Sequence, residues 1–142
     1  MQVIRATITY GLLSVFLAIP CHADIVVVVN KSSPVTQLNA DQLEKIFLGK
    51  LNTFPDGGVA VPLDLPKGPV RDAFYARITG GKNSNQIKAY WSRVVFTSAG
   101  QPPREVDSPQ ETLGLVLRNP SHIGYMERSH ANQSVRIVFA TQ

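Results

Sequence analysis

A short stretch, KGPVR at residues 67–71, has the residue types of an anion site. It follows an apolar segment and leads into an expected helix. Backbone N–H groups at the start of a helix have no partner within the helix and carry partial positive charge. The N–H groups of Gly68, Val70 and Arg71 would face a ligand, and Lys67 and Arg71 would add side-chain cations. The stretch therefore predicts a site for a small inorganic anion, and a solvated helix face with ordinary cations is the alternative.

Patterns typical of catalysis are missing from the sequence. It contains no nucleophile-elbow motif, no HExxH motif and no glycine-rich phosphate loop ending in Lys-Ser or Lys-Thr. His122 and His130 are eight residues apart, which does not fit the close spacing of a zinc pair. We therefore predict a protein that is not an enzyme and uses neither a metal nor a cofactor.

Four aromatic residues could line a ligand pocket, but their helical spacing favours packing in the core. They are Phe74, Tyr75, Tyr90 and Trp91. Among them we expect Tyr75 to face outward.

The first 23 residues have the pattern of a secretory signal. Arg5 precedes an apolar run at residues 11–19, Pro20 breaks the run, and small residues lead up to Ala23. We expect cleavage after Ala23 and a periplasmic location. Attachment of a lipid to Cys21 is the weaker alternative, because Pro20 stands where a lipoprotein signal needs a small residue.

The expected mature chain, residues 24–142, has 119 residues and no cysteine, which suits an oxidising compartment. Without Arg5 it has 13 basic and 10 acidic residues, and the two signs are interspersed. No basic stripe is visible, so we expect no nucleic-acid partner. No further apolar run approaches the roughly 20 residues that span a bilayer, so we expect no membrane span after cleavage. The length favours one domain.

The pattern of apolar residues and turn signals predicts strands that alternate with helices. The continuous β-branched run at 24–30 predicts a strand that is covered on both faces of a parallel or mixed sheet. Further strands are expected at 59–65, 123–126 and 135–140, with an extended piece at 104–106. Helices are expected to begin at caps Asn39, Asn83 or Ser84, and Asp107 or Ser108, and a fourth begins at Pro69. This order predicts a three-layer α/β domain.

Five phrases, in this order, carry a resemblance to a known family. They are VVVVNKSSPV, LNADQLEKIFLGK, VRDAFYARITG, YWSRVVFTSAGQPP and NPSHIGYM. Together they resemble the phosphate-type periplasmic solute-binding proteins of ABC importers. That family has two α/β lobes that close on the ligand. The resemblance implies that this chain corresponds to a single three-layer α/β/α lobe of the type II periplasmic-binding-protein fold.

The resemblance also compares the KGPVR stretch with the phosphate loop of the family, which runs from an arginine and an acidic residue into Gly-Ser-Gly-Thr-Arg. Gly68 stands at the family's serine and Val70 at its threonine, so both hydroxyl donors are missing. The family's upstream arginine falls near Asp64, and Lys67 stands where a glycine would be. The resemblance implies that Arg71 and the backbone N–H groups are the only parts of the family's site that this sequence keeps.

Two functions follow as hypotheses. The first is an exported, non-catalytic domain that docks onto another envelope protein, such as a transporter or a sensor. The alternative is weak binding of a phosphate-like anion at Gly68–Arg71. Each charge-assisted hydrogen bond contributes about 1.5–3 kcal/mol, so the loss of several would leave an affinity in the millimolar range or weaker.

Overall fold

The structure is a computed structural model that describes residues 24–141. The predicted secretory signal, its cleavage point and Cys21 lie outside the described residues. The described elements are, in order, β1 (Ile25–Asn30), α1 (Ala40–Phe47), β2 (Val61–Asp64), α2 (Pro69–Thr79), α3 (Ser84–Phe96), β3 (Arg104–Glu105), α4 (Pro109–Arg118), β4 (His122–Glu127), the 3-10 turn η1 (Arg128–His130) and β5 (Val135–Ala140).

The strands form one mixed sheet with the order β3-β2-β4-β1-β5. β1 is antiparallel to both β4 and β5, whereas β2 is parallel to β4 and β3. All five apolar residues of β1 are at most 1% exposed. The prediction of a strand covered on both faces of a mixed sheet is therefore confirmed.

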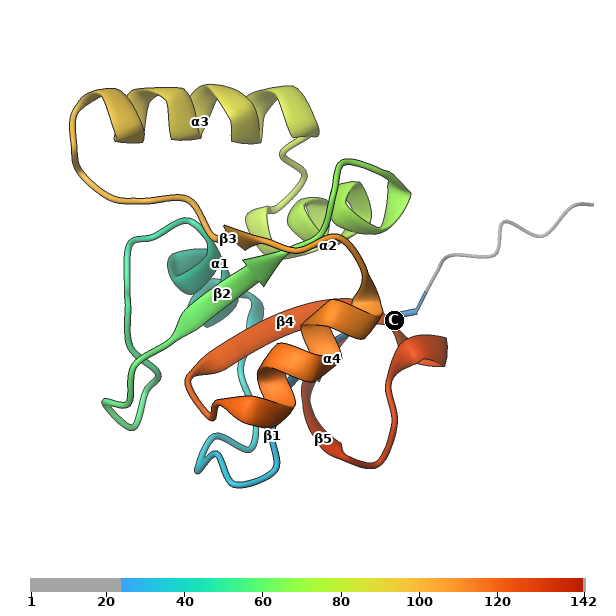
Figure 1. Cartoon of the computed structure of the whole chain (residues 1–142). Helices are drawn as coiled ribbons and strands as arrows, with labels where there is room; N and C mark the ends of the chain where they lie inside the picture. Colours follow the sequence, from blue (N-terminus) through green and yellow to red (C-terminus); the bar gives the residue numbers. More distant parts are fainter. Residues whose placement is uncertain (1–23, 142) are drawn as a thin grey trace, which may run out of the picture.

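Helices cover both faces of this sheet. α4 packs on β4, β1 and β5, and in Figure 1 it crosses the near face of the sheet. α2 packs on β1 and β4, and α1 packs on α2 and β2. Figure 1 shows α1 behind the sheet, on the side away from α4. The predicted three-layer α/β arrangement is confirmed.

The helix starts follow from their capping residues. Asn39 and Asn83 each form a capping box, with Gln42 and Gln86 respectively, at the starts of α1 and α3. Ser108 caps α4 by accepting a hydrogen bond from the N–H of Glu111 at 3.1 Å. Short polar side chains thus satisfy N–H groups that the helices cannot pair internally, and the sequence alone locates these starts.

α3 differs from the other helices because it stands away from the sheet, as Figure 1 shows at the top of the view. Only Ile87 and Trp91 of this helix are buried. Val95 at the end of the helix is 52% exposed, and Phe96 is 90% exposed. Helical spacing shows which residues share a face, but only the fold decides how much of that face a neighbour covers.

Within the described part of the chain, every helix is too short or too polar to cross a membrane.

Candidate functional site

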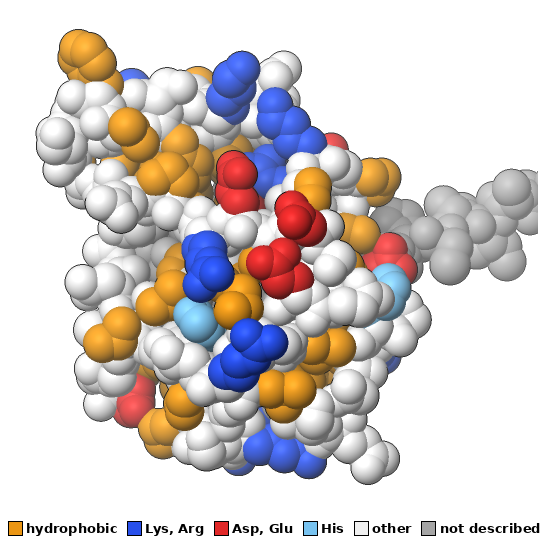
Figure 2. Space-filling view, viewed as in Figure 1, with side chains coloured by type: hydrophobic (Ala, Val, Ile, Leu, Met, Phe, Trp, Pro, Cys, Tyr) orange, Lys and Arg blue, Asp and Glu red, His pale blue; other side chains and the backbone are white. Residues whose placement is uncertain are grey.

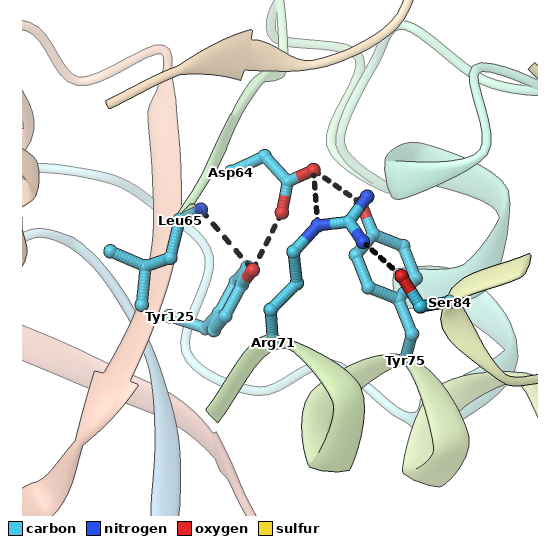
Figure 3. Close-up of polar contacts among 6 residues, drawn as sticks. All are labelled: Asp64, Leu65, Arg71, Tyr75, Ser84 and Tyr125. Atoms are coloured by element: carbon cyan, nitrogen blue, oxygen red, sulfur yellow. Dashed lines mark hydrogen bonds and ion pairs between the residues drawn. The ribbon is translucent and has the colours of Figure 1, made fainter. Parts of the chain in front are cut away.

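The end of β2 carries a buried carboxylate that is surrounded by donors. Asp64 is only 6% exposed. Its Oδ1 accepts a hydrogen bond from the Tyr125 hydroxyl at 2.6 Å, and its Oδ2 accepts from the Tyr75 hydroxyl and from Arg71 Nε, both at 3.2 Å. The Tyr125 hydroxyl also accepts from the N–H of Leu65 at 3.2 Å. Figure 3 shows how these side chains converge on the carboxylate.

Two elements bring the donors to this point. β2 lies parallel to β4, so Tyr125 of β4 lies beside the end of β2. Arg71 and Tyr75 are four residues apart in α2 and therefore share one face of the helix. The Arg71 guanidinium lies over the Tyr75 ring, 4.9 Å from its centroid. A longer contact of 3.5 Å joins Arg71 Nη1 to Ser84 Oγ, at the start of α3.

Burial sets the protonation of this cluster. Burial raises the pKa of Asp64 above its ordinary value, and the Tyr125 hydrogen bond and the Arg71 charge oppose that rise. Burial would lower the pKa of Arg71, but attraction to Asp64 outweighs it and the pKa is raised. Burial and the neighbouring carboxylate raise the pKa values of Tyr75 and Tyr125, so both remain protonated donors. Asp64 and Arg71 therefore form an internally neutralised pair.

The predicted anion-site residues lie together at the start of α2, but only Arg71 among them forms an ion pair in the structure. Gly68 is the N-cap residue of α2 and, as a glycine, has no side chain that could accept from the N–H groups of the helix. Val70 has no polar side-chain atom. The Arg71 side chain is 13% exposed and pairs with Asp64. Lys67 is exposed and forms no ion pair with any residue in 24–141. The backbone N–H groups and Lys67 are thus the donors that the fold leaves free here.

The expectation that Tyr75 faces outward is wrong. Its side chain is 1% exposed, and its hydroxyl is bonded to Asp64. α2 is covered by the sheet and by α1, so more than one stripe of the helix is buried. The neighbouring Phe74 is in the core, as predicted, and stacks on Tyr125 with ring centroids 3.9 Å apart. A buried tyrosine needs a partner for its hydroxyl, and the acidic residue at the end of an apolar strand was the sequence signal for one.

A groove of about 620 Å³, which we call the α3 groove, lies between α3, the end of β2 and the segment before β3. Its apolar lining consists of Trp91, Val95, Phe96, Pro102 and Pro103. Its polar lining includes Lys67, Lys88, Ser84, Glu105 and the Asp64–Arg71 pair. Sequence reasoning missed this groove, because its residues come from four separate segments and form no motif.

His122 and His130 lie near opposite ends of β4. His122 Nδ1 lies 3.0 Å from the backbone oxygen of Leu115, at the end of α4. His130 is exposed in η1. In residues 24–141, no three His, Cys, Asp or Glu side chains gather closely enough to hold a metal ion.

Comparison with known proteins gives matches only at the level of structure. The sequence matches no protein-family model and no curated protein. Among solved structures, the chain is similar to a protein described as a phosphate ABC transporter substrate-binding protein from Clostridium perfringens, with 24% identity and a TM-score of 0.62. That structure contains bound phosphate. The match covers 82% of this chain and 45% of that one.

Two further solved structures show a similarity of the same extent. An ABC-type phosphate transport receptor from Vibrio cholerae is 18% identical with a TM-score of 0.62, and the match covers 82% of this chain and 46% of the receptor. PstS from Borrelia burgdorferi is 14% identical with a TM-score of 0.61, over 82% of this chain and 47% of that protein. At these identities the comparison shows the fold. The chain spans less than half the length of each protein, and the predicted resemblance to one lobe of phosphate-binding proteins is confirmed for the fold.

Proposed function

We propose that this chain, which has the fold of one lobe of phosphate-binding proteins, acts as a non-catalytic docking domain in the cell envelope. Its partner is another envelope protein, a transporter or a sensor. The periplasmic location rests on the secretory signal expected at residues 1–23. The non-catalytic role is supported by the structural neighbours, which are described as substrate-binding proteins and transport receptors.

The Asp64–Arg71 pair is the observation that carries this proposal. A tight phosphate site needs several charge-assisted hydrogen bonds, each contributing about 1.5–3 kcal/mol. Here the arginine at the helix start already donates to Asp64 at 3.2 Å. Gly68 and Val70 contribute no hydroxyl donor. The resulting loss of donors argues against capture of phosphate as the main activity.

Exposed apolar side chains at the end of α3 support docking. Phe96 is 90% exposed and Val95 is 52% exposed, and they are adjacent in sequence. Large apolar side chains that gather on a surface often mark an interaction site. Since α3 stands away from the sheet, a partner can reach this end of the helix without disturbing the core (Figure 1).

Photo-crosslinking in intact cells tests the proposal. A photoreactive residue at position 96 of the full chain should yield an adduct with a second envelope protein. The matched control is position 117, because Leu117 is also an exposed apolar residue, 45% accessible, but lies on α4. Adducts at position 96 that contain only copies of this chain, or equal adducts at both positions, would contradict docking through α3.

The alternative is weak binding of an inorganic anion at the start of α2. It is favoured by the exposed Lys67 beside the free N–H groups of Gly68, Val70 and Arg71. A ligand at 100 times its dissociation constant adds about 2.7 kcal/mol to stability, which raises Tm by several degrees. At about 10 mM a site of millimolar affinity would be mostly occupied and would still raise Tm, and we expect no rise with phosphate, sulfate or acetate. A rise that disappears in Lys67→Gln would favour the alternative.

A further inference from the structure

We propose that the α3 groove binds a small amphipathic monocarboxylate, a medium-chain aliphatic acid, with its carboxylate at the start of α3 and its chain toward the end. The groove volume of about 620 Å³ falls within the range of small-molecule sites, roughly 300–1,000 Å³. This inference does not depend on the docking partner proposed above, because it concerns the isolated protein.

The lining changes from polar to apolar along one face of α3. Ser84 and Lys88 line the groove at the start of the helix, Trp91 lies in the middle, and Val95 and Phe96 lie at the end. Figure 2 shows basic and acidic side chains near the start of α3 and hydrophobic ones toward its end. From Lys88 to Phe96 the helix rises about 12 Å, which is the length of an extended medium-chain acid.

The charges favour a monoanion. Lys67 and Lys88 both line the groove, and neither forms an ion pair with a residue in the described range. Asp64 and Arg71 neutralise each other, which leaves Glu105 as the acidic residue that offsets one lysine. The lining therefore has one positive charge in excess, complementary to a single carboxylate.

Trp91 forms part of the apolar wall of the groove. Its side chain lines the groove and is only 8% exposed. In residues 24–141, its Nε1 is the one buried side-chain polar atom that has no hydrogen-bond partner. A chain that packs against the indole ring would therefore change the surroundings of this residue without contacting the buried Nε1.

The apolar part of the lining explains why an inorganic anion is a poorer match. Val95 and the prolines at positions 102 and 103 offer no donors, and the indole N–H of Trp91 is buried. Phosphate would use the lysine end and leave this wall in contact with water. An aliphatic chain would cover the same wall and gain affinity from the apolar surface that it buries.

Intrinsic fluorescence tests the proposal directly, because Trp91 is the single tryptophan of the sequence. The protein, purified from cells that express the full chain, is titrated with butyrate, hexanoate, octanoate and decanoate below their micelle-forming concentrations. We expect a saturable change in emission whose apparent affinity rises by up to about fourfold per methylene. The indole N–H resonance, a single peak in a ¹⁵N-labelled sample, should shift with the same dissociation constant.

Charge specificity is tested with n-octylammonium, inorganic phosphate and two lysine variants. Lys88→Gln should weaken octanoate binding by about tenfold. Lys31→Gln, an exposed lysine between β1 and α1 that does not line the groove, should leave binding unchanged. Three results would overturn the proposal: no saturable response to octanoate or decanoate, equal binding of n-octylammonium, or binding of phosphate as tight as that of octanoate. None of them bears on the crosslinking test of docking.

Discussion

The sheet with its two helix layers and the region around α3 differ in how tightly the chain is packed. Phe74 and Tyr125 are fully buried and stack on each other between α2 and β4. In α3, by contrast, only Ile87 and Trp91 are buried. The apolar packing that stabilises the fold is therefore concentrated in the sheet layers, and α3 contributes little of it.

The Asp64 cluster lies where these two regions meet. Arg71 is bonded to Asp64 at the end of β2 and lies 3.5 Å from Ser84 at the start of α3. A second link is the hydrogen bond from the Tyr90 hydroxyl to the backbone oxygen of Leu48 at 2.6 Å. α3 is thus held by a few polar contacts and two buried side chains rather than by a continuous apolar interface.

The largest expected difference in stability is between two Phe→Ala variants, one in the sheet layers and one in α3. Phe74→Ala removes a fully buried ring and should lower the free energy of unfolding by about 3–5 kcal/mol. Phe96→Ala removes a ring that is 90% exposed and should change it by less than about 0.5 kcal/mol. Urea unfolding measures both. A loss at Phe96 comparable with that at Phe74 would contradict the division into a packed and a free region.

A pair of glycines gives the next largest effect. A Cβ at Gly124 of β4 would lie 2.4 Å from Thr112 Cγ2 of α4, so Gly124→Ala should cost about 1–3 kcal/mol. Gly114, within α4, has only the end of the Arg118 side chain nearby, at 3.7 Å. Gly114→Ala should therefore be neutral or stabilise by up to about 1 kcal/mol. Thermal unfolding of both variants checks the contrast, and a neutral Gly124→Ala would mean that α4 is not closely packed on the sheet.

Variants of the two capping boxes test whether α1 and α3 unfold together with the rest of the protein. Asn39→Ala at α1 should lower the free energy of global unfolding by about 1 kcal/mol. Asn83→Ala removes the same interaction from α3. We expect its effect mainly as faster amide hydrogen exchange within α3, with a smaller loss of global stability. Equal global losses from both variants would show that α3 unfolds only with the rest of the protein.

The smallest expected effect is a pH dependence of the free energy of unfolding that arises from Asp64. Because burial raises the pKa of Asp64 above its ordinary 3.8, the native state binds this proton more readily than the unfolded chain does. The stability contributed by Asp64 is therefore fully present below its ordinary pKa and is lost as pH rises through the raised value.

Comparison with Asp64→Asn isolates this contribution. The free energy of unfolding of the wild type, relative to that of the variant, should increase as pH falls from 7 toward 4. Urea unfolding at several pH values measures the difference. A relative advantage that grows with rising pH would mean that the hydrogen bonds from Arg71 and the tyrosines outweigh burial.

Local signals located most of the elements correctly. Asn39 caps α1, as predicted, and of the two candidates for each of the other starts, Asn83 caps α3 and Ser108 caps α4. The predicted strand 59–65 is longer than β2, which spans Val61–Asp64, because Val59 pairs with Thr53 outside the sheet and the N–H of Leu65 donates to the Tyr125 hydroxyl. Cap and strand signals depend on neighbours in sequence, and this is why they could be recognised without the fold.

Local sequence patterns specify the buried strand β1 and the starts of the helices. The pairing of Arg71 with Asp64, and the groove between α3 and the segment before β3, follow from the tertiary fold and from no local pattern. The partners of the Asp64 carboxylate come from α2 and from β4, and Tyr125 is separated from it by 61 residues. No local pattern encodes such a meeting, which arises when parallel strands and the helix that covers them bring distant side chains together.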